Sequence, residues 1–101
     1  QMLATMVVKK CINMVRQLKG IIVGVVENMS YFETPDGERY EIFGPGNGPE
    51  LVNMTGAPLL AQLPIDPQLT SLCDAGRVEE YHAEAYDLLA QNFVNTLKIK
   101  R

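Results

Sequence analysis

The sequence predicts an α/β fold with a mostly parallel sheet, and two observations carry that prediction. A helical pattern near the start leads through a short link into the wholly apolar run 21–26. A run that is apolar on both faces is typical of a buried parallel strand, and a helix followed at once by such a strand is half of a βαβ unit. A second apolar run, 58–64, has proline only at its ends, where a strand tolerates it.

The elements that surround these strands follow from local patterns. The first helix ends at Gly20 and carries one apolar stripe, formed by Leu3, Met6, Val7, Cys11, Met14, Val15 and Leu18. Aromatic residues flank the turn signal Pro35-Asp36-Gly37, which predicts an antiparallel hairpin over 31–43. The glycine-rich stretch 44–49 predicts a flexible loop, and a short helix from about Glu50 to Thr55 follows it.

The C-terminal part is predicted to be helical. Asp66 suits the cap of a short helix that begins at Pro67 and ends near Gly76. The last helix is predicted over about 78–97, with an apolar face that comprises Tyr81, Ala85, Leu88, Leu89, Phe93 and Leu97. Because only two sheet strands are predicted, we expect their neighbours to come from a longer protein or from another copy. The helical pattern that starts at Gln1 without a cap predicts a chain cut from something longer.

Composition narrows the classes of function. The chain has 101 residues, which suits one domain, and its formal net charge of -3 gives no basic footprint for nucleic acid or acidic lipid. No apolar run approaches the roughly 20 residues that span a bilayer, and no signal peptide opens the chain. The two cysteines, Cys11 and Cys73, form no metal-type pair and are predicted to be reduced thiols. These features predict a cytoplasmic protein.

The chain shows no classical catalytic arrangement. His82, the only histidine, is predicted to lie on a helix, and a base needs a nucleophile within hydrogen-bond reach. No glycine-rich loop is followed by Lys-Ser or Lys-Thr, so no Walker A motif is present to hold phosphates. The stretch 44–48 is glycine-rich but lacks the lysine and follows a hairpin. It is therefore a weak candidate for a phosphate site.

Polar residues meet the ends of the two predicted strands. Asn28 follows the first strand, and Pro64, Ile65 and Asp66 follow the second. Ligands of open α/β sheets bind just outside the carboxyl ends of the strands. An asparagine amide both donates and accepts hydrogen bonds, as the edge of adenine requires. Pro64 offers a flat apolar wall, and backbone groups near Ile65 and Asp66 are available for the remaining edge. The residues alone leave open that Asn28 only satisfies a turn and Asp66 only caps a helix.

Several blocks of the sequence, in this order and spacing, resemble the Mrp/ApbC family. The blocks are Glu27-Asn28-Met29-Ser30-Tyr31-Phe32, Pro35-Asp36-Gly37, Ile42-Phe43-Gly44, Leu59-Leu60 with Leu63-Pro64-Ile65-Asp66-Pro67, and Asp74-Ala75-Gly76-Arg77. Members of this family are P-loop ATPases of the MinD/ParA class that carry iron–sulfur clusters to target proteins. The resemblance runs from Gln1 to about the start of the last helix.

The resemblance implies that residues 1–101 are the C-terminal part of a single Mrp/MinD-like domain with a doubly wound, mostly parallel sheet. It implies that ATP, with Mg²⁺, binds across a homodimer, that Asn28 contacts adenine, and that the loop of Pro64, Ile65 and Asp66 closes over the base. It also implies partners among iron–sulfur client or scaffold proteins.

Two departures from the family pattern limit these implications. Cluster-binding members have Cys-x-x-Cys just after the Asn-Met-Ser segment, whereas residues 33–37 contain no cysteine. Thiolate ligation of a cluster at this position is therefore excluded. The Walker A motif is also missing, so we do not expect this chain alone to hydrolyse ATP.

Two hypotheses of different classes follow. In the first, the chain is the adenine side of an ATPase that acts in iron–sulfur cluster assembly or transfer. In the second, the hairpin 31–43 and an exposed sheet edge mediate dimerisation or partner docking, and no nucleotide binds.

Overall fold

The structure is a computed structural model that describes residues 2–42, 44 and 46–99. It confirms an α/β fold. The elements of the described chain, in order, are α1 (Met2–Gln17), β1 (Val25–Glu33), β2 (Arg39–Tyr40), α2 (Gly48–Thr55), β3 (Leu59–Pro64), α3 (Pro67–Asp74), the 3-10 turn η1 (Val78–Glu80) and α4 (Glu84–Ile99). No helix among these residues is both long enough and apolar enough to cross a membrane.

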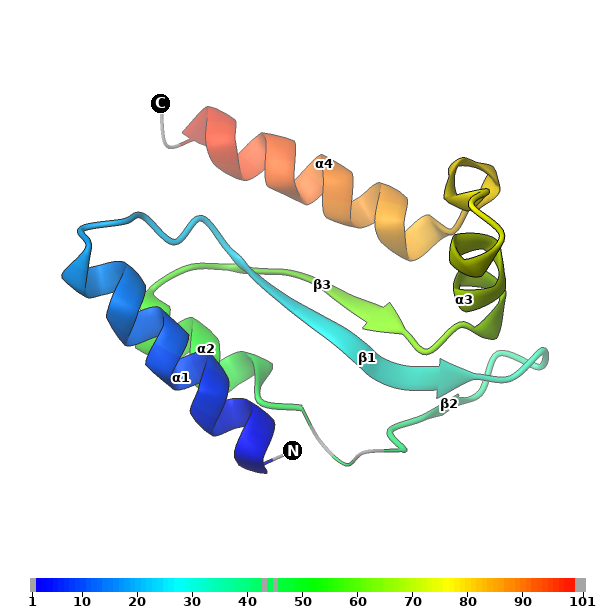
Figure 1. Ribbon diagram of the computed structural model, residues 1–101, viewed down its shortest axis with the longest axis horizontal. Helices are drawn as coiled ribbons and strands as arrows, with labels where there is room; N and C mark the ends of the chain where they lie inside the picture. Colours follow the sequence, from blue (N-terminus) through cyan, green and yellow to red (C-terminus); the bar gives the residue numbers. More distant parts are fainter. Residues whose placement is uncertain (1, 43, 45, 100–101) are drawn as a thin grey trace.

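β1 is the central strand of the sheet. It pairs with β3 in parallel and with β2 in antiparallel orientation, so the strand order is β2-β1-β3. The two predicted sheet strands therefore do lie side by side with their carboxyl ends at the same edge. In Figure 1, α4 runs along one side of the strands, and α1 and α2 lie together on the other.

β1 begins later and ends later than the predicted strand 21–26. Pairing with β3 starts where Val25 lies opposite Leu59, and residues 21–24 belong to no strand. A strand needs a hydrogen-bonded neighbour, and the described chain supplies none for residues 21–24. Ile21 is accordingly 81% exposed. The apolar pattern predicts a strand in this part of the chain, but pairing with β3 determines where β1 begins.

An irregularity interrupts β1 at the polar segment. Glu27 pairs with Gln62 and Tyr31 pairs with Pro64, so residues 28–30 of β1 lie opposite the single residue Leu63. Met29 has a φ of 51°, which is uncommon for a residue with a side chain. This is the geometry of a β-bulge, which bends a strand and redirects its side chains. Asn28 therefore lies in a bulge within the strand and not in a turn after it.

The predicted hairpin is confirmed and is continuous with β1. Phe32 pairs with Tyr40 and Glu33 with Arg39, while Gly37 supplies a φ of 89° in the turn. The amide of Thr34 donates to the carbonyl of Glu38 at 2.9 Å and closes the turn. Phe43, the predicted end of the hairpin, lies outside the described residues.

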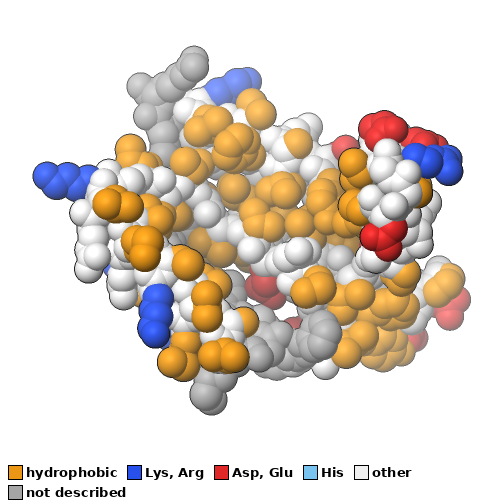
Figure 2. Space-filling model, in the orientation of Figure 1, with side chains coloured by type: hydrophobic (Ala, Val, Ile, Leu, Met, Phe, Trp, Pro, Cys, Tyr) orange, Lys and Arg blue, Asp and Glu red, His pale blue; other side chains and the backbone are white. Residues whose placement is uncertain are grey.

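The apolar stripe predicted for the first helix is mostly exposed. Leu3 and Leu18 are 73% and 77% exposed, and the buried residue of α1 is Ile12, which was not assigned to the stripe. Figure 2 shows hydrophobic side chains at the surface over α1 and along the strip between β1 and α4. The apolar stripe therefore lies largely at the surface of the described chain.

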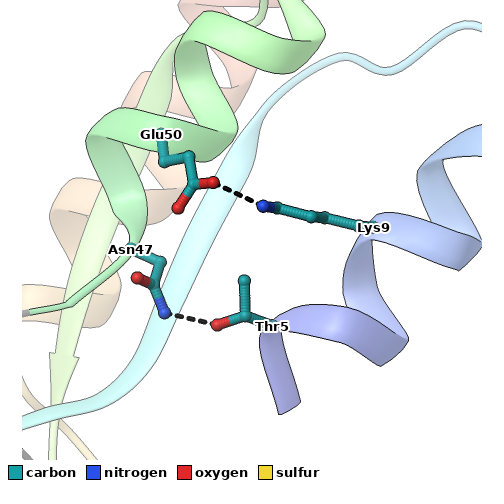
Figure 3. A network of polar contacts seen from close by, with 4 residues as sticks. All are labelled: Thr5, Lys9, Asn47 and Glu50. Atoms are coloured by element: carbon teal, nitrogen blue, oxygen red, sulfur yellow. Dashed lines mark hydrogen bonds and ion pairs between the residues drawn. The ribbon is translucent and has the colours of Figure 1, made fainter. Parts of the chain in front are cut away.

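Polar contacts attach α1 to α2 and the loop before it (Figure 3). Lys9 Nζ lies 2.5 Å from Glu50 Oε1, and Asn47 Nδ2 donates to Thr5 Oγ1 at 2.5 Å. The Arg16 guanidinium donates to the carbonyl oxygen of Met54. Because exposed ion pairs contribute little free energy, these contacts orient α1 more than they stabilise it.

The helix predicted over 78–97 is in two pieces. η1 ends at Glu80, the next residue, Tyr81, is extended with a ψ of 129°, and α4 begins at Glu84. The side chain of Tyr81 is used in a tertiary hydrogen bond to Asp66. A continuous helix through residues 81–83 would need helical backbone angles at Tyr81. His82 lies in this break and is exposed.

The hydrophobic core is small and centres on the strands. Its members, drawn from α1, β1, β3 and the link between α2 and β3, are Ile12, Tyr31, Ala57, Leu60 and Leu63. Gly24 lies against the Leu60 side chain so closely that a β-carbon would overlap it. The core therefore fixes the β1–β3 pair, and with it the edge where the predicted site lies.

Candidate functional site

The carboxyl ends of β1 and β3 are joined directly. Pro64 lies opposite Tyr31, and the amide of Ile65 donates to the carbonyl oxygen of Tyr31 at 2.7 Å. The bend that follows β3 is thereby held against the end of β1. We call residues 64–66 the rim loop.

Asp66 anchors the rim loop. Its Oδ1 accepts from the amide of Gln68 at 3.0 Å, which confirms the predicted cap of α3. Its carbonyl oxygen accepts from the amide of Leu69 at 3.2 Å. Its Oδ2 accepts from the hydroxyl of Tyr81 at 2.7 Å, a contact that no local sequence pattern predicts. Both carboxylate oxygens are therefore occupied.

Tyr81 is held from two sides. Its ring meets that of Tyr86 edge to face, with 5.5 Å between the centroids. Burial, and second to it the hydrogen bond to Asp66, raises the pKa of the Tyr81 hydroxyl above its ordinary value. The hydroxyl therefore stays protonated and donates to Asp66 across the ordinary pH range.

One peptide of the rim loop keeps both polar groups available. The carbonyl of Ile65 and the amide of Asp66 have no hydrogen-bond partner among the described residues. They belong to the same trans peptide and point in opposite directions. The orientation of this peptide therefore decides whether the loop offers an acceptor or a donor to a ligand.

Asn28 is exposed, and one of its two side-chain polar atoms has a hydrogen-bond partner. Its Oδ1 accepts from the amide of Met29 at 2.9 Å, a local contact within the bulge. Within the described chain its Nδ2 has no partner. The side chain therefore retains two donor hydrogens for a ligand, while its acceptor is already used locally.

The structure does not bring the four predicted residues into one cavity. Asn28 lines a hollow of about 190 Å³ between the bulge, α1 and the glycine-rich loop. Pro64, Ile65 and Asp66 line a groove of about 860 Å³ between the hairpin, β3 and the start of α4. The two hollows share no lining residue. A ligand that touches both sets must therefore extend from one hollow to the other.

Glu27 was not among the residues predicted to form the site. Its Oε1 accepts from the Ser30 hydroxyl at 2.8 Å, while its Oε2 is buried and has no partner among the described residues. A β-carbon on Gly46 would overlap the carboxylate, and one on Gly48 would lie 2.6 Å from Oε2. The carboxylate therefore rests against the glycine-rich loop at the start of α2. A negative charge at this helix N-terminus disfavours a phosphate there.

The hairpin carries a cation. The guanidinium carbon of Arg39 lies 4.4 Å from the centroid of the buried Tyr31 ring, within cation–π distance. Arg39 lines the same groove as the rim loop. It brings positive charge to a groove whose lining also includes Glu33 and Glu84.

The described residues contain no group of three or more His, Cys, Asp or Glu side chains that could hold a metal ion. Cys11 and Cys73 are exposed and unpaired, on α1 and α3, which lie at opposite ends of the molecule in Figure 1. Four-thiolate ligation of an iron–sulfur cluster does not fit two separated cysteines.

Parallel strands that end in polar groups, with helices on both sides, define the class of open α/β nucleotide-binding folds. Within that class, the model of the family described as "ParA: NUBPL iron-transfer P-loop NTPase" matches residues 1–98. The chain belongs to this family, and its fold is that of part of a P-loop NTPase.

Known proteins resemble the chain over part of their own length. An iron-sulfur cluster carrier protein of Saccharolobus solfataricus is 47% identical over 74 residues, which are 72% of this chain and 25% of that protein. The Fe-S cluster assembly factor HCF101 of rice chloroplasts is 41% identical over 95 residues, which are 94% of this chain and 18% of that protein.

A solved structure is similar as well. It is the structure of a nucleotide-binding protein of Archaeoglobus fulgidus in complex with ADP, in which cobalt was found. It matches this chain with a TM-score of 0.67 and 44% sequence identity. The similarity covers 78% of this chain and 33% of that chain. The chain thus spans a third or less of each of these three proteins.

Proposed function

We propose that this chain forms the base-binding side of an ATP site in an ATPase that acts in iron–sulfur cluster assembly or transfer. Membership of a P-loop NTPase family, relatives named as cluster carriers and assembly factors, and a structural neighbour in complex with ADP support the proposal. The observation that carries it is the junction of β1 and β3, where the Ile65 amide donates to the Tyr31 carbonyl. That junction puts the rim loop and the bulge with Asn28 at one edge of the sheet.

The available polar groups fit the edge of adenine. Adenine presents ring nitrogen acceptors beside an amino donor, and Asn28 Nδ2 offers donors to such a nitrogen. The Ile65–Asp66 peptide offers one further donor or acceptor. Because Asn28 and the rim loop line different hollows, the base would extend from one hollow to the other and contact both.

We also propose that residues 1–101 are the C-terminal part of a single Mrp/MinD-like domain. The exposed apolar stripe of α1 and the edge of β1 beside residues 25–30, which β2 does not cover, are surfaces that further strands and helices would bury. The longer relatives support this reading. Contacts to the phosphates and Mg²⁺, and hydrolysis, would belong to residues outside this sequence, which has no Walker A motif.

Calorimetry tests the proposal. The complete protein should bind ATP, whereas the 101-residue chain should bind it far more weakly, because phosphate contacts at a helix N-terminus supply much of the affinity. Micromolar binding of ATP by the chain alone would contradict the assignment of only the base side. A complete protein that binds tripolyphosphate as tightly as ATP would show that the base is not recognised.

The cluster would be cargo of the whole protein and not a ligand of this hairpin. The hairpin has no cysteine between Glu33 and Gly37. Ligands for a cluster would come from residues elsewhere in the protein. Reconstitution with iron and sulfide, followed by absorption spectroscopy on the Cys11→Ser and Cys73→Ser variants, should give the spectrum of the unsubstituted protein.

The proposed setting is a cytoplasmic homodimer that meets client or scaffold proteins. A rat relative is named a cytosolic assembly factor, while the relatives from rice and Arabidopsis are chloroplastic. Sedimentation of the complete protein with and without ATP tests the dimer. A monomer under both conditions would contradict it.

The second candidate function is a docking module without nucleotide. The segment after the hairpin exposes Ile42 at 59%, and the bulge exposes Met29 at 54%. Substituting Ile42 with serine separates the two functions. Loss of the dimer with unchanged ATP affinity would favour the docking module.

A further inference from the structure

We infer that Tyr81 is a positioning residue for the base site, because it fixes the rim loop from the segment that precedes the C-terminal helix α4. The inference rests on the proposed function and adds to it a residue that contacts neither the base nor the phosphates. It begins from the hydrogen bond of 2.7 Å from the Tyr81 hydroxyl to Asp66 Oδ2.

The rim loop has few other restraints. Ile65 is tied to Tyr31 by one backbone hydrogen bond, and Asp66 is tied to α3 by its Oδ1 and its carbonyl oxygen. The contacts of Asp66 with Gln68 and Leu69 are local, so they move together with α3. Among the described residues, the hydroxyl of Tyr81 is the one side-chain donor that links Asp66 to a segment beyond α3.

The restrained peptide is the one that matters for recognition. The carbonyl of Ile65 and the amide of Asp66 are both unpartnered within the described chain, and only one of them can face a bound base. Rotation of this peptide exchanges an acceptor for a donor. By fixing the Asp66 side chain, Tyr81 limits the rotation of the peptide directly before it.

The side chain of Tyr81 is itself held in place by packing. Its ring packs edge to face on Tyr86 of α4, and the break in the helix at residues 81–83 lets its hydroxyl reach Asp66. Helix α4 packs along β3, and Asn92 Nδ2 donates to the carbonyl oxygen of Leu60 at 2.8 Å. The rim loop is therefore held by β1 through Tyr31 and by α4 through Tyr81 and Tyr86, and both β1 and α4 contact β3.

The test compares Tyr81→Phe with the matched variant Tyr40→Phe in the complete protein. Tyr40→Phe also removes a tyrosine hydroxyl that donates to a carboxylate, that of Glu38, but on the exposed hairpin. Affinities for ATP and for tripolyphosphate are measured by calorimetry. Amide hydrogen exchange at Ile65 is followed in the same proteins.

Tyr81→Phe should weaken ATP binding about tenfold, the size expected when a hydrogen bond to a charged group is lost. Tripolyphosphate affinity should stay within about twofold, because the phosphates do not use the rim loop. Exchange of the Ile65 amide should become about fivefold faster, since its bond to Tyr31 is less restrained. Tyr40→Phe should match the unsubstituted protein in all three measurements.

Other results would overturn the inference in distinguishable ways. If the unsubstituted protein prefers ATP to tripolyphosphate and Tyr81→Phe keeps that preference, Tyr81 does not position the base site, while the proposed function stands. Equal losses for both ligands would show a general loss of stability and not positioning. If the unsubstituted protein has no preference for ATP, the proposed base site itself fails, and the inference fails with it.

Discussion

The Ile65 amide and the Tyr31 carbonyl oxygen lie 2.7 Å apart and join the bend after β3 to the end of β1. Two segments more than thirty positions apart in the sequence thereby form one rim. Tyr31 is also a buried member of the core and supports the guanidinium of Arg39. The same residue therefore contributes to the packing of the sheet and to the shape of the candidate site.

Tyr31→Ala should lower the free energy of unfolding by about 3 kcal/mol or more, because truncating a buried aromatic side chain leaves a cavity in a small core. Tyr31→Phe should cost much less, since the ring remains and the hydroxyl has no partner among the described residues. Urea denaturation monitored by circular dichroism measures both. A loss below 1 kcal/mol for Tyr31→Ala would show that this ring does not hold the sheet together.

Asn28→Ala in the complete protein should weaken ATP binding by about 1–3 kcal/mol, because the base edge would lose a hydrogen-bond donor. The matched control is Asn53→Ala, which removes an exposed asparagine of α2 away from the rim. Calorimetry with ATP measures both variants. An unchanged dissociation constant for Asn28→Ala would remove this residue from the site.

Gly46→Ala should destabilise the protein by about 1–3 kcal/mol, because its β-carbon would overlap the Glu27 carboxylate. The penalty should largely vanish in a Glu27→Ala background. A double-mutant cycle by thermal unfolding measures this coupling. Additive effects of the two substitutions would show that Glu27 does not rest against this loop in solution.

Alkaline pH should weaken the attachment of the rim loop. The pKa of Tyr81 is raised in the folded protein above its unfolded value of about 10. Its contribution to stability is therefore complete below about pH 10 and is lost as the pH rises through the folded-state pKa. Stability measured from pH 8 upward should fall more for the unsubstituted protein than for Tyr81→Phe. Parallel curves would argue against the Tyr81–Asp66 bond.

The 101-residue chain should self-associate through the exposed stripe of α1. Leu18→Glu should reduce association, because it places a charge among side chains such as Leu3 and Met14 that are exposed by more than half. Gln17→Glu adds the same charge on the same helix without removing an apolar group. Light scattering at rising concentration compares them. A monomeric unsubstituted chain would contradict the expectation.

Several features could be predicted because they depend on neighbouring residues. The hairpin turn at Gly37 and the cap of α3 by Asp66 are both expected from local patterns, and the structure shows each of them. The apolar runs 21–26 and 58–64 also indicate the segments that contribute strands to the sheet. These features are decided by backbone angles, capping groups and hydrophobic patterning, which act over a few residues.

Other features were not accessible to sequence patterns, because they depend on which segments meet in space. Asn28 lies in a bulge because residues 28–30 of β1 face the single residue Leu63 of β3. The hydrogen bond from Tyr81 to Asp66 occurs where the predicted last helix is broken. The apolar stripe of α1 is mostly exposed, whereas Ile12, which lies outside the stripe, is buried. Periodicity gives a helix and its apolar face, but only a neighbouring element decides which face is covered.

The sequence by itself determined the α/β class of this protein, the family to which it belongs and the polar residues at its strand ends. Only the tertiary structure decided how those residues are arranged, with Asn28 in one hollow and the rim loop in another. The physical reason is that strand pairing and side-chain contacts between distant segments set register, bulges and peptide orientation, whereas local preferences act within each segment.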